Sequence, residues 1–182
     1  VEEFLEGEEA SLLAFVDGET AVLMPSAQDH KPIGEGDTGP NTGGMGAYSP
    51  APVMTPELEA RAMREVIEPT VRALAKLGTP YKGILYAGLM IKDGDFKVLE
   101  FNCRFGDPEC QPLLMRMDSD LLPVLIACAT GNLANAVVSF SVEPAACVVM
   151  AAGGYPGDYR KGDVISGLNE ANAIGGAYVF HA

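Results

Sequence analysis

Two Asp-Gly pairs, each set between apolar runs, constrain the fold of this chain most strongly. Asp17-Gly18 divides residues 1–24, and Asp93-Gly94 separates the runs GILYAGLMI and FKVLEF. Asp-Gly in such a context favours the tight turn of a β-hairpin, because both residue types tolerate positive φ. The sequence therefore predicts two antiparallel ribbons and, with them, a mainly antiparallel sheet.

The segment after Thr55 carries the first helical pattern. Thr55 can cap a helix with Pro56 in its first turn, apolar residues then recur at helical spacing, and Gly78 ends the pattern. Pro69 lies inside this run and lacks a backbone donor. We therefore expect the helix to kink or to split in two at Pro69.

A second helical region is predicted over residues 113–129. It is expected to form one or two helices, interrupted near Ser119-Asp120 and Pro123, with Gly131 as the C-terminal stop. Helices and strands together predict an α+β fold.

The remaining stretches lack helical periodicity. Residues 25–54 are rich in Gly, Pro, Asp and Thr and predict a long loop. Residues 145–152 predict a buried strand, and two short strands are expected near the end of the chain. Because the chain opens in VEEFL and stops in AYVFHA, both strand-like, we expect it to be a piece of a longer protein.

Composition and charge argue against several classes of function. The net charge of −13 would repel a phosphate backbone, so we expect no nucleic-acid partner. No apolar run reaches the roughly 18 residues of a membrane span, and the first residues show no secretion signal. We therefore expect a cytoplasmic protein with no membrane partner. The four cysteines form no C-x-x-C pair, which argues against a zinc site and against a disulfide framework.

The motif Glu100-Phe101-Asn102 is the strongest chemical feature. Side chains alternate along a strand, so Glu100 and Asn102 share one face while Phe101 and Leu99 point to the other. Carboxylate and amide oxygens are hard ligands that suit Mg²⁺ together with nucleotide phosphates. The alternative is a solvated strand end, because an isolated E-x-N is a weak motif.

The turn after this strand, CRFGDPE, places a guanidinium beside two carboxylates. Arg104 suits phosphate or carboxylate through its two-pronged donor geometry. The alternative is that Arg104 only pairs with Asp107 or Glu109.

At this point the motifs form a pattern that spans nearly the whole chain. LYAGLMI followed by VLEFNCRFGDPE, together with VEEFLEGEEAS, QDHKPIGEGDTGPNTGGMGAYSP and AAGGYPGDYRKGD, resembles the glycinamide ribonucleotide synthetases (phosphoribosylamine–glycine ligases) of the ATP-grasp superfamily. The run DTGPNTGGMGAYSP is the most specific part of this resemblance.

The resemblance implies an α+β ATP-grasp fold, in its C-terminal portion, over residues 1–135 and the start of a truncated C-terminal domain over residues 136–182. It also implies that the family's N-terminal domain, the glycine-rich loop over the phosphates and the lysine of the small subdomain lie outside the chain. The isolated 182 residues are therefore expected to be inactive. Many ATP-grasp ligases carry a further acid on the strand before E-x-N, but residues 86–91 have none.

The resemblance implies ATP- and Mg²⁺-dependent ligation, with Mn²⁺ as the alternative metal ion. Glycine would be joined to 5-phosphoribosylamine, giving glycinamide ribonucleotide, ADP and phosphate in purine biosynthesis. The implied roles are the backbone of Glu2 and Leu5 at the adenine edge, Glu9 at the ribose hydroxyls, Glu100 and Asn102 on the metal, Arg104 in catalysis, and Asp29, Lys31, Asn41, Thr42 and Asp107 around the substrates.

Simpler interpretations stand beside these roles. For Glu3, Glu6 and Glu8 a solvated acidic edge is favoured, and any one residue of the loop around Lys31 can be purely structural. Two other functions stay open: a different ATP-grasp carboxylate–amine ligase, or a noncatalytic nucleotide-binding module. The DTGPNTGGMGAYSP run argues against the first, and loss of activity on replacing Glu100 would argue against the second.

Overall fold

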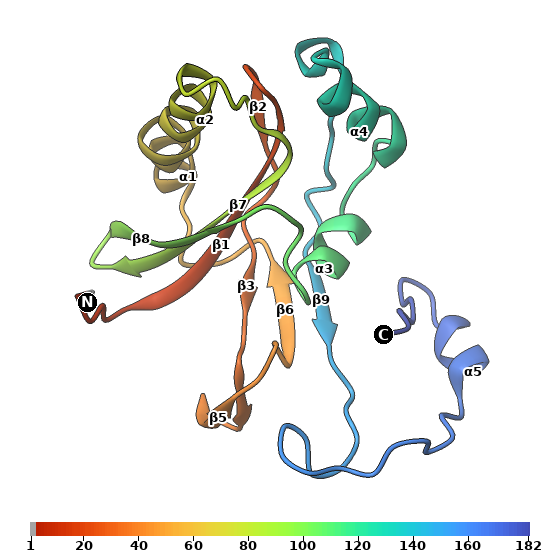
Figure 1. Cartoon of the computed structure of the whole chain (residues 1–182). Coiled ribbons are helices and arrows are strands. Elements are labelled where there is room, and N and C mark those ends of the chain that lie inside the picture. Colours follow the sequence, from red (N-terminus) through yellow and green to blue (C-terminus); the bar gives the residue numbers. More distant parts are fainter. Residues whose placement is uncertain (1–2) are drawn as a thin grey trace.

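A four-stranded antiparallel sheet forms the centre of the computed structural model, which describes residues 3–182 (Figure 1). Its order is β2-β1-β7-β8. The strands are β1 (Glu8–Asp17), β2 (Ala21–Leu23), β7 (Lys82–Lys92) and β8 (Asp95–Asn102). Both predicted hairpins are confirmed, and Asp93 and Gly94 have the positive φ values, 52° and 76°, that the second turn requires.

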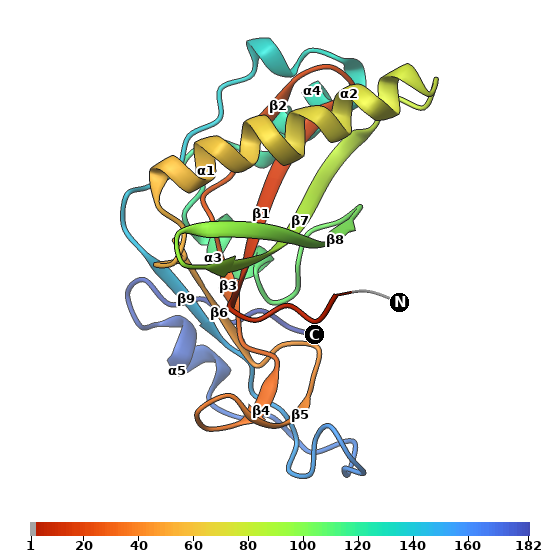
Figure 2. The same ribbon diagram turned by 90° about the vertical axis from the view of Figure 1, so that its left-hand side faces the viewer.

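One helical rod covers one face of this sheet, as Figure 2 shows. It consists of α1 (Pro56–Ala62), the π-helical turn η1 (Met63–Ile67) and α2 (Glu68–Lys76). Thr55 caps it as predicted, because its hydroxyl accepts from the Leu58 amide at 3.2 Å. The rod buries Ile67 and Val71 against Leu12 of β1 and Leu89 of β7, each at most 1% exposed.

The predicted break at Pro69 takes the form of a widened turn. The Glu68 amide donates to the Met63 carbonyl, five residues back, so that η1 lies immediately before the proline. A proline ring in a regular helix clashes with the carbonyl four residues earlier, and a π turn moves that carbonyl aside. The helix therefore continues through Pro69 instead of splitting.

Two helices cover part of the opposite face. These are α3 (Cys110–Met115) and α4 (Leu121–Thr130), followed by the short 3₁₀ turn η2 (Leu133–Asn135). The break near Ser119-Asp120 is confirmed, since Asp120 caps α4 by accepting from the Leu122 amide, and Gly131 ends it with φ 76°. Pro123 does not interrupt the helix, because it lies in the first turn of α4, where no amide is needed.

The expectation of a long loop over residues 25–54 is wrong. This stretch contains β3 (Gln28–Asp29), β4 (Pro32–Gly34), β5 (Thr38–Asn41) and β6 (Gly46–Ser49). A sheet β3-β6-β9 uses β9 (Ala145–Val148), while β4 pairs with β5. Strands of two to four residues are too short to show an alternating pattern, so composition alone suggested a loop.

The C-terminal stretch also differs from its prediction. β9 ends at Val148 and is half exposed, whereas a buried strand over residues 145–152 was expected. Within residues 149–182, α5 (Leu168–Asn172) takes the place of the two expected short strands. Apolar side chains in this stretch, such as Met150 and Val164, are 95% and 94% exposed, so they pack against very little of the described chain. A short strand here would have no neighbouring strands or core to stabilise it. No helix of residues 3–182 is long and apolar enough to cross a membrane.

Candidate functional site

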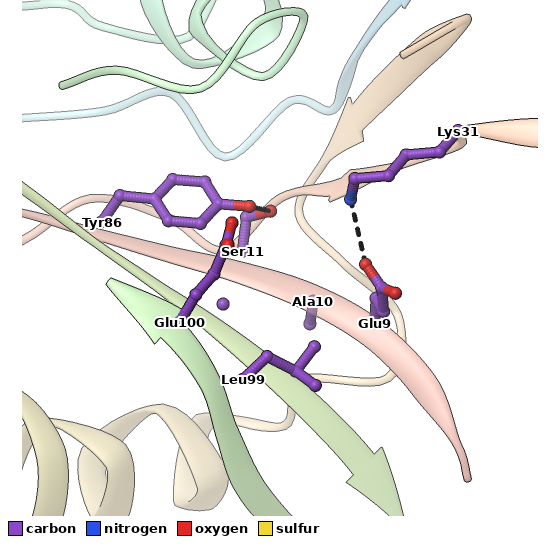
Figure 3. A pocket seen from close by; sticks show the side chains of 8 residues that line it. Glu9, Ala10, Ser11, Lys31, Tyr86, Leu99 and Glu100 are labelled. Atoms are coloured by element: carbon purple, nitrogen blue, oxygen red, sulfur yellow. Dashed lines mark hydrogen bonds and ion pairs between the residues drawn. The ribbon is translucent and has the colours of Figure 1, made fainter. Parts of the chain in front are cut away.

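A cavity of about 300 Å³ opens on the part of the sheet that α3 and α4 leave uncovered (Figure 3). The start of β1, the middle of β7 and the end of β8 form its floor, and the segment between β3 and β4 reaches over it. Its lining residues are Glu9, Ala10, Ser11, Lys31, Tyr86, Gly88, Leu99 and Glu100.

The pairing register of β1, β7 and β8 places the residues of the cavity floor next to one another. Ser11 lies opposite Gly88, and Gly88 lies opposite Glu100, so three neighbouring strands present these positions on one face. A bulge interrupts the β7–β8 pairing between Gly88 and Leu89, and Leu99 lines the same cavity as Glu100. The expectation that Leu99 points away from Glu100 is therefore wrong, because a bulge breaks strict alternation.

Glu100 and Asn102 do lie on one face, as expected. The Asn102 amide nitrogen donates to Glu100 Oε1 at 2.9 Å, which leaves the Asn102 carbonyl oxygen and the second Glu100 oxygen as acceptors. This donor set fits a hard divalent cation. Residues 3–182 contain no cluster of three or more His, Cys, Asp or Glu side chains that could hold a metal by themselves. A cation here would need oxygen ligands from water or from a bound phosphate.

Lys31 reaches into the cavity (Figure 3), where its ammonium group pairs with two carboxylates. Its ammonium group lies 2.9 Å from Glu9 Oε2 and 3.0 Å from Asp29 Oδ2, and the Asp29 side chain is only 5% exposed. Burial by itself would lower the pKa of Lys31, but the bonds to Glu9 and Asp29 outweigh it and raise that pKa above its ordinary value. The cavity therefore contains one firmly charged cation.

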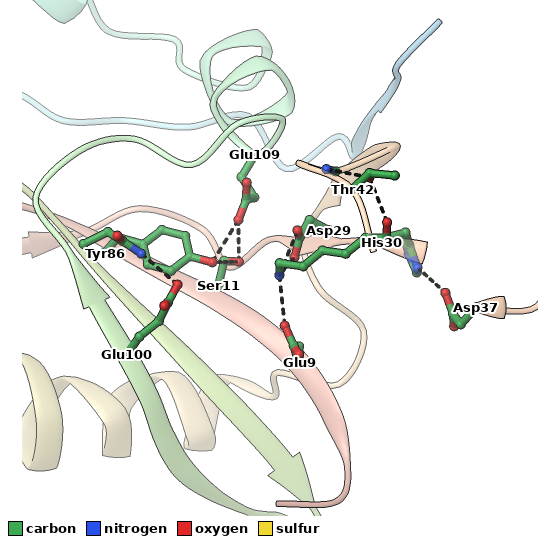
Figure 4. Close-up of polar contacts among 12 residues, drawn as sticks. Glu9, Ser11, Asp29, His30, Asp37, Thr42, Tyr86, Glu100 and Glu109 are labelled. Atoms are coloured by element: carbon green, nitrogen blue, oxygen red, sulfur yellow. Dashed lines mark hydrogen bonds and ion pairs between the residues drawn. The ribbon is translucent and has the colours of Figure 1, made fainter. Parts of the chain in front are cut away.

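A buried polar network underlies the floor. Glu109, 3% exposed, accepts at Oε1 from the Ser11 hydroxyl at 2.8 Å and from the Tyr86 hydroxyl at 3.0 Å (Figure 4). Burial and then the neighbouring Glu109 carboxylate raise the pKa of Tyr86, so the phenol stays protonated and donates. Sequence analysis missed Ser11 and Tyr86, although each is a polar residue on the cavity face of its strand.

Comparison with known proteins places the chain. Residues 1–110 match the family model described as "Phosphoribosylglycinamide synthetase, ATP-grasp (A) domain", and residues 145–182 match the C domain of the same enzyme. The chain belongs to the phosphoribosylglycinamide synthetase family. The predicted domain boundary at residue 135 lies between the two matches and stays a prediction.

Relatives of this synthetase family are similar over the whole chain. Phosphoribosylamine–glycine ligases from Brucella melitensis and from Arabidopsis thaliana, the latter chloroplastic, are 58% and 57% identical over all of this chain. The chain spans 43% and 35% of their lengths. The crystal structure of the Thermotoga maritima ligase covers 87% of this chain, with a TM-score of 0.78 and 36% identity; this chain covers 40% of it.

A more distant structure supports the ATP-grasp-like fold alone. N5-carboxyaminoimidazole ribonucleotide synthetase from Thermus thermophilus has a TM-score of 0.56 at 15% identity, over 80% of this chain and 36% of that chain. The predicted α+β fold, with an antiparallel sheet and flanking helices, is confirmed.

Residues 25–54 contribute Lys31 and Asp29 to the cavity region, but their other two candidates, Asn41 and Thr42, lie outside the cavity lining. Thr42 donates to the Lys31 carbonyl at 2.8 Å and accepts from the Gly44 amide at 3.0 Å, so it fixes the backbone that carries Lys31. Asn41 is exposed on β5 opposite Pro32, outside the cavity lining.

The turn after β8 places Arg104 and Asp107 at exposed positions. Arg104 donates to the Phe105 carbonyl at 2.7 Å, and Asp107 accepts from the side-chain amide of Gln111 at 2.9 Å. Among the residues that the structure describes, Arg104 forms no ion pair with Asp107 or Glu109. The guanidinium therefore keeps most of its donors for a ligand.

The segment before β1 holds the remaining candidates. Leu5 is half buried and precedes the strand, while Glu2 lies outside the described residues. Glu3 and Glu6 pair with Lys97 and Lys92 at 2.7 Å, each with its side chain 70% exposed. Such exposed pairs contribute little to stability, in keeping with a solvated acidic edge.

Proposed function

We propose that this chain provides the metal- and nucleotide-binding cavity of a phosphoribosylamine–glycine ligase. In this proposal, glycine is joined to 5-phosphoribosylamine in de novo purine biosynthesis, and ATP is cleaved to ADP and phosphate. The observation that carries it is that Glu100 lines a cavity together with Glu9 and Lys31 and accepts a hydrogen bond from Asn102, in a chain of this family.

Glu100 and Asn102 would hold Mg²⁺, or Mn²⁺ in its place, through one carboxylate and one amide oxygen. Such a cation neutralises charge that develops on transferring phosphate oxygens. With two protein ligands, the remaining coordination positions are left for water and for phosphate oxygens of the nucleotide.

The start of the chain would hold the nucleoside. The backbone of Glu2 and Leu5 would bond the adenine edge, and Glu9 would accept from the ribose hydroxyls. Only Oε2 of Glu9 bonds Lys31, and its side chain is 48% exposed, so the carboxylate can accept further donors while it keeps that pair.

The substrates would occupy the side of the cavity formed by the β3–β4 segment and the turn after β8. The glycine carboxylate would attack the γ-phosphoryl group, and the amine of phosphoribosylamine would then capture the acyl phosphate. Lys31, held charged by Asp29, would bind an anionic group, and Arg104 would neutralise charge on the phosphoryl group. Asp107 would face the substrates, and Asn41 and Thr42 would act through the backbone around Lys31.

Replacement of Glu100 by Ala in the full-length protein tests this function. We expect Mg²⁺-dependent turnover to fall by about 100-fold or more, because a ligand that neutralises transition-state charge is removed. Glu19→Ala is the matched control, since Glu19 is exposed in the β1–β2 turn at the far end of β1. Unchanged activity of Glu100→Ala would favour a noncatalytic nucleotide-binding module or a metal site elsewhere.

A substrate panel separates the remaining alternative, another ATP-grasp carboxylate–amine ligase. ADP release that depends on both glycine and phosphoribosylamine supports the proposal, and release with a different acid or amine contradicts it. We also propose a cytoplasmic location, and we expect the isolated 182 residues to show no turnover.

A further inference from the structure

Glu109 is a buried carboxylate that the proposed function leaves without a role. It directly precedes α3, and 97% of its surface is hidden from solvent. A carboxylate in such a place is unfavourable unless hydrogen bonds replace its water. Two hydroxyl donors, from Ser11 and Tyr86, meet its Oε1, and the two hydroxyl oxygens lie 2.9 Å apart.

These donors belong to the floor of the cavity. Ser11 is on β1 and Tyr86 is on β7, the two central strands, and both line the cavity beside Gly88 and Glu100. Glu109 lies 98 residues from Ser11 along the chain. One carboxylate therefore ties the start of α3 to the strands that carry the candidate nucleotide site.

The turn between β8 and α3 closes around the same carboxylate. A Cβ atom added to Gly106 would lie 2.8 Å from Glu109 Oε1, closer than real Cβ atoms approach an oxygen, so the glycine permits this packing. The Cys110 amide donates to the Gly106 carbonyl at 2.9 Å and completes the turn. Residues 103–108 are thus held between Asn102 at one end and Glu109 at the other.

The side chain at the centre of this turn depends on that anchor. Within residues 3–182, the one hydrogen bond of the Arg104 side chain goes to the neighbouring Phe105 carbonyl. Nothing beyond its own turn fixes the guanidinium, so its position follows the backbone of the turn. The backbone in turn follows the bonds that Glu109 makes to the sheet.

We propose that Glu109 is a positioning residue that holds the Arg104–Asp107 turn beside the cavity through Ser11 and Tyr86. The expected effect of Glu109 on kcat rests on the proposed function. Its expected effect on the position of residues 103–108 does not. Glu109 acts here by geometry, as a hydrogen-bond acceptor, and its negative charge is not the property that matters.

Two substitutions in the full-length protein separate geometry from charge. Glu109→Met removes the acceptor, and Glu109→Gln keeps an acceptor oxygen without the charge. We expect kcat to fall by about 100-fold in Glu109→Met, because small misplacement of a reacting group has such an effect, and Glu109→Gln to stay within about fivefold of the parent. The affinity for Mg-ADP, measured by calorimetry, should change by less than about threefold in both. Equal losses in the two variants would overturn the inference.

Arg104→Ala supplies the second readout. If Glu109 acts through Arg104, then Glu109→Met should lower kcat little further in an Arg104→Ala background, because coupled residues are not additive. Full additivity of the two losses would contradict the proposal. Glu19→Met is the control for the same change of residue type at an exposed position.

Hydrogen exchange tests the anchor without any turnover. In Glu109→Met we expect faster exchange of the amides of residues 103–107 and of residue 109, with residues 82–92 unchanged. Tyr86→Phe, which retains the ring, should give the same pattern to a smaller degree and covers the case in which Glu109→Met does not fold. Unchanged exchange over residues 103–109 would overturn the proposal even if ligase activity is found, and failure of the activity assay would leave this readout intact.

Discussion

The two ends of one face of the central sheet have different surroundings: one lies in the hydrophobic core and the other lines the cavity. Towards the β1–β2 turn, Leu13 and Phe15 of β1 and Ile84 of β7 lie under α4 and form a core with it. Towards the start of β1, the same face presents Ser11 and Gly88, which line the cavity. The strands run on without a break, so the change from core to candidate site occurs within two residues, between Leu13 and Ser11. What differs is the polarity of alternate side chains, which pack under α4 at one end and line the cavity at the other.

The largest effect is expected at the covered end. Phe15→Ala should lower the free energy of unfolding by about 3–5 kcal/mol, because it removes a fully buried ring and leaves a cavity. Denaturant titration measures this loss. If Ser11→Ala were equally destabilising, the contrast between the two ends would be wrong.

Asp17 gives the covered end a pH dependence. The Leu133 amide donates to Asp17 Oδ2 at 2.9 Å and the Thr20 amide to Oδ1 at 2.8 Å. Burial would raise the pKa of Asp17, but these backbone donors outweigh it and lower that pKa below its ordinary value of 3.8. The stabilisation is therefore present above pH 3.8 and is lost as the pH falls through the lower, folded-state pKa.

Asp17→Asn should accordingly cost about 2 kcal/mol near neutral pH, and the difference from the parent should shrink in acid. Unfolding curves at a series of pH values measure it. A difference that stays constant down to about pH 2 would contradict the assigned role of the carboxylate.

Tyr86→Phe tests the boundary between the two ends, because Tyr86 packs in the covered core and also lines the cavity. The ring still packs, but Glu109 loses one of its two hydroxyl donors, so we expect a loss of about 1–2 kcal/mol in unfolding free energy. Tyr81→Phe is a comparison on a tyrosine outside the cavity lining. Full stability of Tyr86→Phe would mean that the buried carboxylate does not depend on this bond.

Gly88→Val should leave stability nearly unchanged and affect binding. A Cβ atom at this position would lie 3.3 Å from Glu100 Cγ, at the centre of the cavity floor. We expect Mg-ADP affinity to fall by at least about tenfold, close to 1.4 kcal/mol, in calorimetric titration. Retained affinity would place the nucleotide elsewhere.

Sequence patterns predicted the parts of the molecule that local chemistry decides. The Asp-Gly turns specified both hairpins, and alternation placed Glu100 with Asn102. Patterns failed where distant segments decide. Nothing near Glu109 indicates that it meets Ser11, and nothing near β6 indicates that it pairs with β9 in a distant part of the chain.

The bulge at the end of β8 decides which side of the sheet receives the candidate metal ligand. Counting back from the hairpin turn, where Lys92 faces Asp95, unbroken pairing would set Glu100 opposite Ala87, on the side packed against α1–α2. One additional residue in β8 shifts the pairing register by one position, so Glu100 lies opposite Gly88 instead. A single-residue insertion in the ladder thus moves the acid from the side of the sheet that carries α1 and α2 to the side that lines the cavity.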